Sequence, residues 1–89
     1  MTRDEQAYTL ALIELCRRRP ETQDDCCALA ARVDVAMYGI PQSDDEYLDR
    51  AIGIARGLFG PAFRAATGHQ KRAWIDMCER ALRDEAEPA

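Results

Sequence analysis

The chain has 89 residues, 47% of them hydrophobic, which suits one domain with one modest core, because a chain of this size buries roughly 60 to 65% of its unfolded surface. Sixteen acidic and twelve basic residues give a formal net charge of −4, which argues against general binding to the nucleic-acid backbone. No apolar run approaches the ~20 residues of a membrane span, and the first six residues carry charges of both signs rather than a secretory pattern. We expect a single domain over residues 1–89, with neither export signal nor membrane anchor, in the cytoplasm.

The first predicted helix begins at a capping box formed by Thr2 and Glu5 and ends near Arg18, before Pro20. Its predicted inward face comprises Tyr8, Ala11, Leu12, Leu15 and Cys16. A second apolar stripe, Leu10 and Ile13 with Gln6 and Arg17, lies nearly opposite that face. Two interpretations stay open: another segment of the monomer covers this stripe, or it is a docking or dimer surface.

The second predicted helix starts at Thr22, an N-cap followed by acidic residues in the first turn. It ends at Gly39, which suits the left-handed position after a helix, with apolar Ile40 and then Pro41 beyond. The predicted inward stripe comprises Cys26, Leu29, Ala30, Val33 and Met37.

The third predicted helix begins at a capping box of Ser43 and Glu46. Its predicted inward stripe is Leu48, Ala51, Ile52, Ala55 and Phe59, with Tyr47, Ile54 and Leu58 on the flank. Gly53 and Gly57 indicate either a close helix crossing or a frayed second half, since glycine weakens a helix interior. Gly60 and Pro61 then break the helix and leave a short helical turn around residues 61–66.

The last predicted helix, over residues 67–82 and fraying after Ala86, has the clearest pattern, and we expect the fold to be organised around it. Thr67 and Gln70 form a capping box, and Trp74, the only tryptophan, is predicted to be buried as the largest piece of the core. Its apolar stripe comprises Trp74, Met77, Cys78, Ala81 and Leu82. The opposite face predicts ion pairs four residues apart: Arg72 with Asp76, Asp76 with Arg80, and Glu79 with Arg83. The chain is therefore predicted to be all-α, a compact bundle of four main helices plus the short turn.

The cysteines are predicted to be free thiols without a bound metal. No C-x-x-C spacing occurs, and adjacent Cys26 and Cys27 point about 100° apart on a helix, which does not suit a zinc site. Cys16, Cys26 and Cys78 are instead expected to behave as small buried hydrophobic residues. A thiol-based metal or redox sensor is the least favoured functional alternative.

The chain is not expected to be an enzyme or to bind a cofactor. His69 has no serine or aspartate at a recognisable triad spacing, and Ser43, the only serine, is best used as a cap. No G-x-G-x-x-G or G-K-[ST] sequence supports a phosphate-binding loop. Asp44, Asp45 and Glu46 lack the pattern of a calcium-binding loop.

Small size, acidity, helicity and missing catalytic groups favour a protein-binding module, in analogy with small bacterial or phage-borne inhibitors such as immunity or antitoxin proteins. Four acids in six positions exceed what a helix dipole needs and predict a concentrated, unneutralised negative potential for a basic, nucleic-acid-binding partner surface. The candidate partner-binding residues are Asp44, Asp45, Glu46, Asp49, Leu10, Ile13 and Arg17. A homodimer through the Leu10/Ile13 stripe is a further option. The alternative is a helix-turn-helix-like DNA-binding regulator turning at Gly39, which acids at the start of the next helix disfavour.

Overall fold

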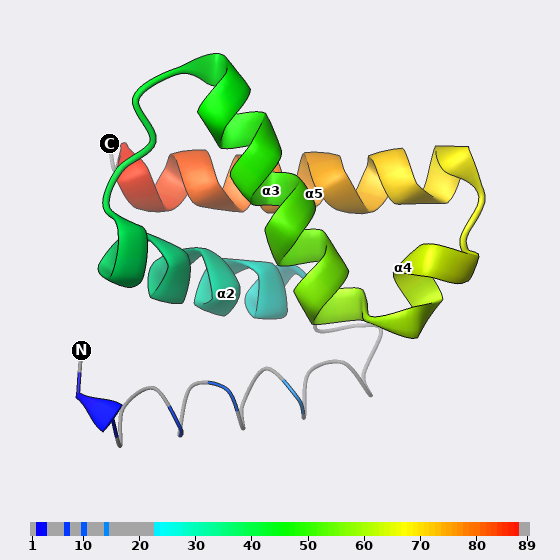
Figure 1. Cartoon of the computed structure of the whole chain (residues 1–89), viewed down its shortest axis with the longest axis horizontal. Helices are drawn as coiled ribbons and strands as arrows, with labels where there is room; N and C mark the ends of the chain where they lie inside the picture. Colours follow the sequence, from blue (N-terminus) through cyan, green and yellow to red (C-terminus); the bar gives the residue numbers. More distant parts are fainter. Residues whose placement is uncertain (1, 4–6, 8–9, 11–13, 15–22, 88–89) are drawn as a thin grey trace.

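A computed structural model of the chain describes residues 2, 3, 7, 10, 14 and 23–87 (Figure 1). Within them lie α2 (Gln23–Tyr38), α3 (Asp44–Phe59), α4 (Pro61–Ala65) and α5 (Gly68–Ala86), and no described residue is in a strand. Residues 3, 7, 10 and 14, from the first predicted helix, are also helical. The predicted all-α bundle is therefore confirmed. The predictions that lie outside the described residues are the capping box of Thr2 with Glu5, the Tyr8, Ala11, Leu12, Leu15 and Cys16 face, the end near Arg18, the placement of Ile13 and Arg17, and the Thr22 N-cap.

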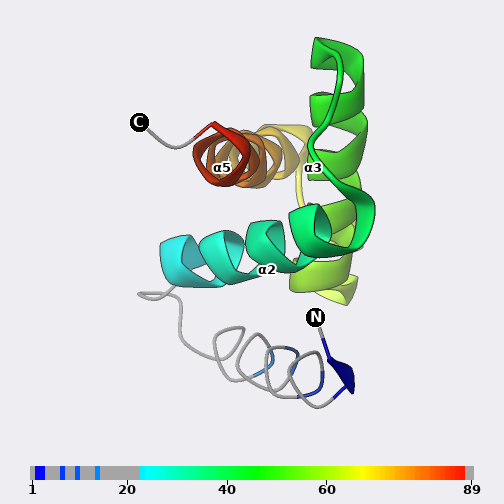
Figure 2. The same ribbon diagram turned by 90° about the vertical axis from the view of Figure 1, so that its left-hand side faces the viewer.

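Helix α5 packs against both α2 and α3, and these two contacts are more extensive than the one between α2 and α3. Helix α3 runs across one side of the pair formed by α2 and α5 (Figures 1 and 2). The short α4 then returns the chain from the end of α3 to the start of α5. The last helix is thus the one on which both α2 and α3 pack most extensively, in line with its predicted organising role.

The helix ends follow from local sequence, as predicted. The Thr67 hydroxyl accepts a hydrogen bond from the Gln70 backbone N–H at 3.1 Å, and Ser43 caps α3 in the same way. Gly39 adopts a φ of +79°, and its N–H donates to the Val35 carbonyl at 2.8 Å, which closes α2.

The buried face of α5 matches its predicted stripe, because Cys78 and Leu82 are fully buried and Met77 and Ala81 are partly buried. Trp74 was predicted to be buried and is only half-buried, so that prediction is wrong in degree. Its ring stacks on Phe59, with centroids 4.4 Å apart, at the end of the bundle where α4 turns back. An indole in that position covers the end of the core instead of filling its middle.

The predicted faces of α2 and α3 need correction. On α2, Cys27 and Ala31 are buried together with Cys26, whereas Met37 is 50% exposed. This shift arises because α2 contacts both α3 and α5, so its buried surface spans two directions. On α3 the buried residues are Tyr47, Ala51, Ala55 and Leu58, while Leu48, Ile52 and Phe59 are only partly buried.

Gly53 and Gly57 do not mark a close crossing between α3 and the other described helices. A Cβ atom built at either position would meet no atom of the described residues within 4 Å. Helix α3 also continues past both residues to Phe59. Both glycines are exposed.

Candidate protein-binding surface

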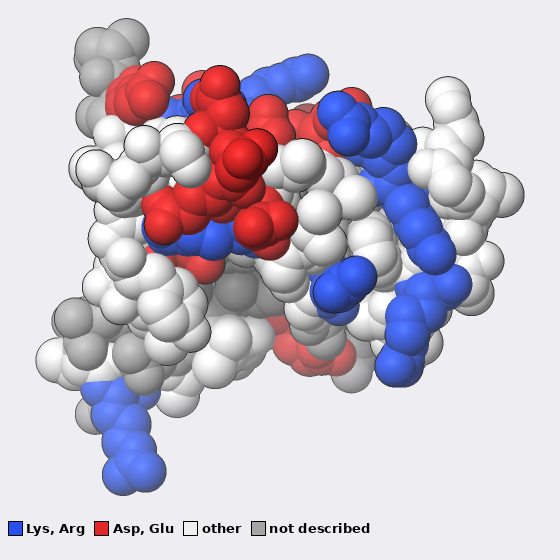
Figure 3. Space-filling model, turned by 45° about the horizontal axis from the view of Figure 1, so that its top comes forward, with Lys and Arg blue, Asp and Glu red and all other residues white. Residues whose placement is uncertain are grey.

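The acidic turn, which we define as Asp44, Asp45, Glu46 and Asp49, lies at the start of α3. Figure 3 shows acidic side chains gathered on the face where α3 begins. Two of these acids are paired, because Asp44 lies 3.0 Å from Arg83 and Glu46 lies 3.8 Å from Arg50. The predicted unneutralised cluster is thus corrected to a partly neutralised one.

Arg83 reaches the acidic turn from α5, 39 residues away in the sequence. Its guanidinium lies 4.2 Å from the centre of the Tyr47 ring, which holds it beside Asp44. The hydrogen bond with Asp44 also raises the pKa of Arg83. The spacing of charged residues along α5 predicts a pair between Arg83 and Glu79 but not the contact with Asp44. The predicted pair is also present, at 3.6 Å.

Asp45 and Asp49 remain as the available charges of the acidic turn. Both are exposed, and neither has an ion pair among the described residues. A partner bearing lysine or arginine can therefore reach them without displacing an internal cation. Exposed charges of this kind act mainly on the rate of association and on the choice of partner.

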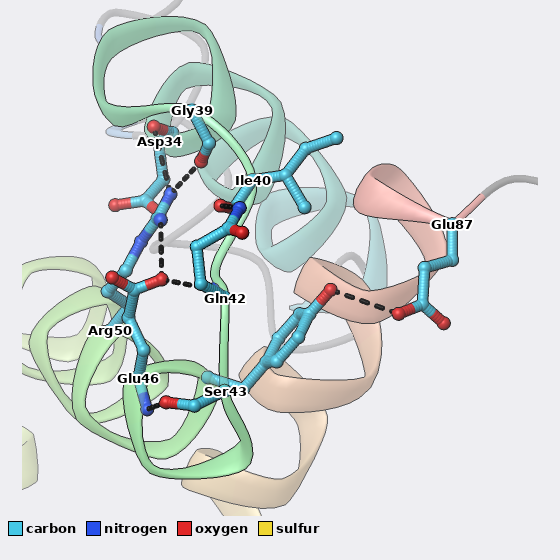
Figure 4. Close-up of polar contacts among 9 residues, drawn as sticks. Asp34, Gly39, Ile40, Gln42, Ser43, Glu46, Arg50 and Glu87 are labelled. Atoms are coloured by element: carbon cyan, nitrogen blue, oxygen red, sulfur yellow. Dashed lines mark hydrogen bonds and ion pairs between the residues drawn. The ribbon is translucent and has the colours of Figure 1, made fainter.

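Glu46 has a structural role as well as a charge. In the predicted capping box its carboxylate would accept from the Ser43 N–H, but it accepts from the Gln42 N–H instead (Figure 4). The Gln42 amide in turn donates to the Ile40 carbonyl at 2.8 Å. These bonds fix the connection between α2 and α3, so Glu46 is not a free acid for recognition.

Arg50 is largely buried and connects α3 to α2. Its guanidinium donates to the Asp34 carboxylate at 2.8 Å and to the Gly39 carbonyl at 2.6 Å (Figure 4). Helix α2 has no basic residue in its last turn, so Arg50 supplies from α3 the cation that favours a helix C-terminus. This arrangement sets the position of α3 relative to α2.

A groove of about 770 Å³ lies between α2 and α3, and we call it the α2–α3 groove. Its apolar lining consists of Leu10, Ala30, Val33, Met37, Tyr38, Gly53, Ile54, Gly57 and Leu58. Its polar lining consists of Asp34, Glu46, Asp49 and Arg50. Leu10 is thus brought to the same groove as Glu46 and Asp49, two residues of the acidic turn, although the two surfaces were predicted to be separate.

Large apolar side chains around the groove are open to solvent. Leu10, Met37 and Tyr38 are 59%, 50% and 69% exposed, respectively. Leu10 therefore lies at the groove without being covered by another segment. Sequence reasoning missed Met37 and Tyr38 as surface residues, because the helical period placed Met37 on the inward stripe. Exposed apolar side chains grouped beside a hollow are typical of an interaction site.

Basic side chains gather away from the acidic turn, toward the end of the molecule that contains α4 (Figure 3). Arg56 and Arg64 line a smaller hollow of about 410 Å³ there. The Lys71 ammonium lies 5.8 Å from the centre of the Phe63 ring. On the face that Figure 3 shows, the largest acidic group and these basic side chains thus lie in different regions.

Cys26, Cys27 and Cys78 are buried and form no disulfide with one another, while Cys16 lies outside the described residues. Cys27 is therefore buried in addition to the cysteines expected to be so. Among the described residues, no group of three histidine, cysteine or acidic side chains could hold a metal ion. His69 is exposed in the first turn of α5.

No protein-family model, curated protein or solved structure matches this chain. None of the helices in the described part of the chain has the length and apolar character needed to cross a membrane. A functional assignment must therefore rest on the surface itself.

Proposed function

We propose that this chain is a small protein-binding module whose α2–α3 groove, with the acidic turn at its edge, occludes a basic surface of another protein. The observation that carries the proposal is the meeting of exposed Leu10, Met37 and Tyr38 with the exposed carboxylate of Asp49 at one groove. Bacterial or phage-borne inhibitors of the immunity, antitoxin or anti-defence type are the class we favour.

The two halves of the surface supply different parts of recognition. Burial of the apolar lining supplies affinity, at about 25 cal/mol per Å² before the costs of association. The Asp45 and Asp49 carboxylates attract lysine and arginine and repel acidic partners. A partner segment that places apolar anchors between basic residues, such as an amphipathic helix, satisfies both halves.

The test is site-specific cross-linking from within the groove. A photoreactive amino acid replaces Gly53, which lines the groove and has open space around its Cβ position. A matched variant carries the same group at Ala73, an exposed residue of α5 outside the groove lining. We expect one partner with a basic surface to be captured from position 53 but not from position 73. Equal capture from both positions, or capture unchanged by Asp49→Lys, would contradict the proposal.

Binding to DNA is the alternative function, because basic side chains gather near α4 (Figure 3). Arg56 and Arg64 share one hollow there, but exposed Asp45 and Asp49 at the start of α3 repel phosphate. Random duplex DNA at low salt distinguishes the two functions. Tight binding that is lost in Arg56→Ala and Arg64→Ala variants would favour the DNA-binding alternative.

A further inference from the structure

Two buried thiols from different helices lie in contact inside the core. The Sγ atoms of Cys27, on α2, and Cys78, on α5, are 3.9 Å apart, although the residues are 51 positions apart in the sequence. Cys27 is 1% exposed and Cys78 is fully buried. A disulfide needs its sulfur atoms about 2.05 Å apart, so small shifts of these two packed helices would allow a bond.

The surroundings make the two thiols unequal. The hydrogen bond from Cys78 lowers the pKa of Cys27, whereas the same hydrogen bond and burial raise the pKa of Cys78. Cys27 borders a hollow that Cys78 does not line, so Cys27 is the thiol placed to meet an oxidant, and it reacts as the thiolate. Cys78 lies beside it, in the position of a second thiol whose sulfur can attack an oxidised Cys27 as its proton leaves.

A small oxidant has a route to Cys27. A hollow of about 310 Å³ lies beside it, bordered by polar residues that include Asp24 and Arg80. A peroxide molecule is little larger than water, which needs about 30 Å³ in the liquid. Cys27 therefore lines a hollow that is large enough for hydrogen peroxide.

We propose that Cys27 and Cys78 form an oxidation site, which hydrogen peroxide converts to a disulfide joining α2 to α5. In the first step the Cys27 thiolate attacks one peroxide oxygen, the O–O bond breaks, and the departing hydroxide takes a proton to become water. In the second step the Cys78 sulfur attacks the Cys27 sulfenic acid, the S–O bond breaks, and the hydroxyl leaves with the Cys78 proton as water. The two thiols lose two electrons, and the peroxide gains them.

The test treats the native full chain with hydrogen peroxide, blocks remaining thiols by alkylation and digests with trypsin without reductant. We expect a disulfide-linked pair of peptides, residues 19–32 joined to residues 73–80, and fragmentation should assign the bond to Cys27. The Cys26→Ala variant should give the same bond, since Cys26 is the adjacent thiol and serves as the matched control. Cys27→Ala should abolish it.

The same oxidation carried out in denaturant tests whether the preference of Cys78 for Cys27 over Cys26 depends on the folded structure. In the unfolded chain Cys26 and Cys27 are equivalent partners for Cys78, so both linkages should appear in comparable amounts. A native reaction that also divides evenly between them, that links Cys16 instead, or that gives sulfinic acid without a bridge would overturn the proposal. If a variant fails to fold, fragmentation of the wild-type bridge decides the same question. A bridge should also raise the urea midpoint of unfolding, and reductant should reverse that rise.

Discussion

The guanidinium of Arg50 lies 2.6 Å from the carboxylate of Asp34, and this ion pair joins α3 to α2 alongside the groove. Their side chains are only 15% and 13% exposed, so solvent screens the pair weakly. The same guanidinium also bonds the Gly39 carbonyl at 2.6 Å. One side chain thus holds the last turn of α2 against α3.

Arg50→Ala should lower the free energy of unfolding by about 2 to 3 kcal/mol, because it leaves a largely buried carboxylate and a helix end without their partner. Arg50→Lys should recover little of this, since lysine cannot reproduce the planar fork of bonds. Urea unfolding followed by circular dichroism measures both. As a control, Arg32→Ala removes an exposed pair with Glu85 and should cost less than about 1 kcal/mol. If Arg50→Ala and Arg32→Ala lowered the free energy of unfolding equally, the buried Arg50–Asp34 pair would stabilise the fold no more than an exposed ion pair.

Leu82→Ala should destabilise the protein at least as much as Trp74→Ala, although tryptophan is the larger residue. Leu82 is fully buried and Trp74 is half-buried. A buried leucine truncation costs about 2 to 5 kcal/mol, and the partial burial of Trp74 places it below the 3 to 5 kcal/mol of a buried tryptophan. Chemical denaturation of the two variants measures the difference, and the native tryptophan emission should lie between those of buried and free indole. A clearly larger loss for Trp74→Ala would restore tryptophan as the main core residue.

The features that the sequence predicts well are those that depend on near neighbours. Caps at Ser43 and Thr67, the turn at Gly39 and the stripe of α5 all involve residues within one or two turns of each other. The contacts that it misses join distant segments. Arg83 reaches Asp44 from another helix, and Met37 is exposed although helical periodicity places it on the inward stripe. Helical periodicity indicates that one face is apolar but not which flank of it is buried, since that depends on packing. Joining Leu10 to the acidic turn likewise required the tertiary structure.

Ionisation of Tyr47 should lower the free energy of unfolding at alkaline pH. Burial and the neighbouring Glu87 carboxylate, which accepts its hydroxyl hydrogen bond at 3.2 Å, raise the pKa of Tyr47 above its ordinary value of 10.0. Below pH 10 the phenol is protonated in the folded and unfolded chains, so its contribution is fully present. Above that pH the unfolded chain releases the proton while the folded chain retains it, and the free energy of unfolding declines until the folded phenol also ionises. Urea unfolding at pH 8 to 11 should show this decline in wild type and a weaker one in Tyr47→Phe. Identical pH profiles would contradict the assignment to Tyr47.

Charge reversal at the acidic turn should weaken binding of the partner captured from the groove. The variant combines Asp45→Lys with Asp49→Lys, because these acids are exposed and have no ion pair among the described residues. Ser43, Asp44 and Glu46 are left intact, since they hold the cap and the bonds to Arg83 and Gln42. Circular dichroism should therefore show an unchanged helical fold.

We expect the association rate to fall by about tenfold or more at low salt, with a smaller difference as salt screens the charges. The corresponding asparagine variants should fall between wild type and the lysine variant, because they remove the attraction without adding repulsion. Asp25→Lys combined with Asp84→Lys, at two exposed residues outside the groove, is the matched control for the same change in net charge and should leave the rate close to that of wild type. Surface plasmon resonance over a salt series measures these rates. If the lysine variant kept the wild-type rate and salt dependence, the acidic turn would not be part of the binding surface, and the apolar lining around Leu10 and Met37 would have to carry recognition alone.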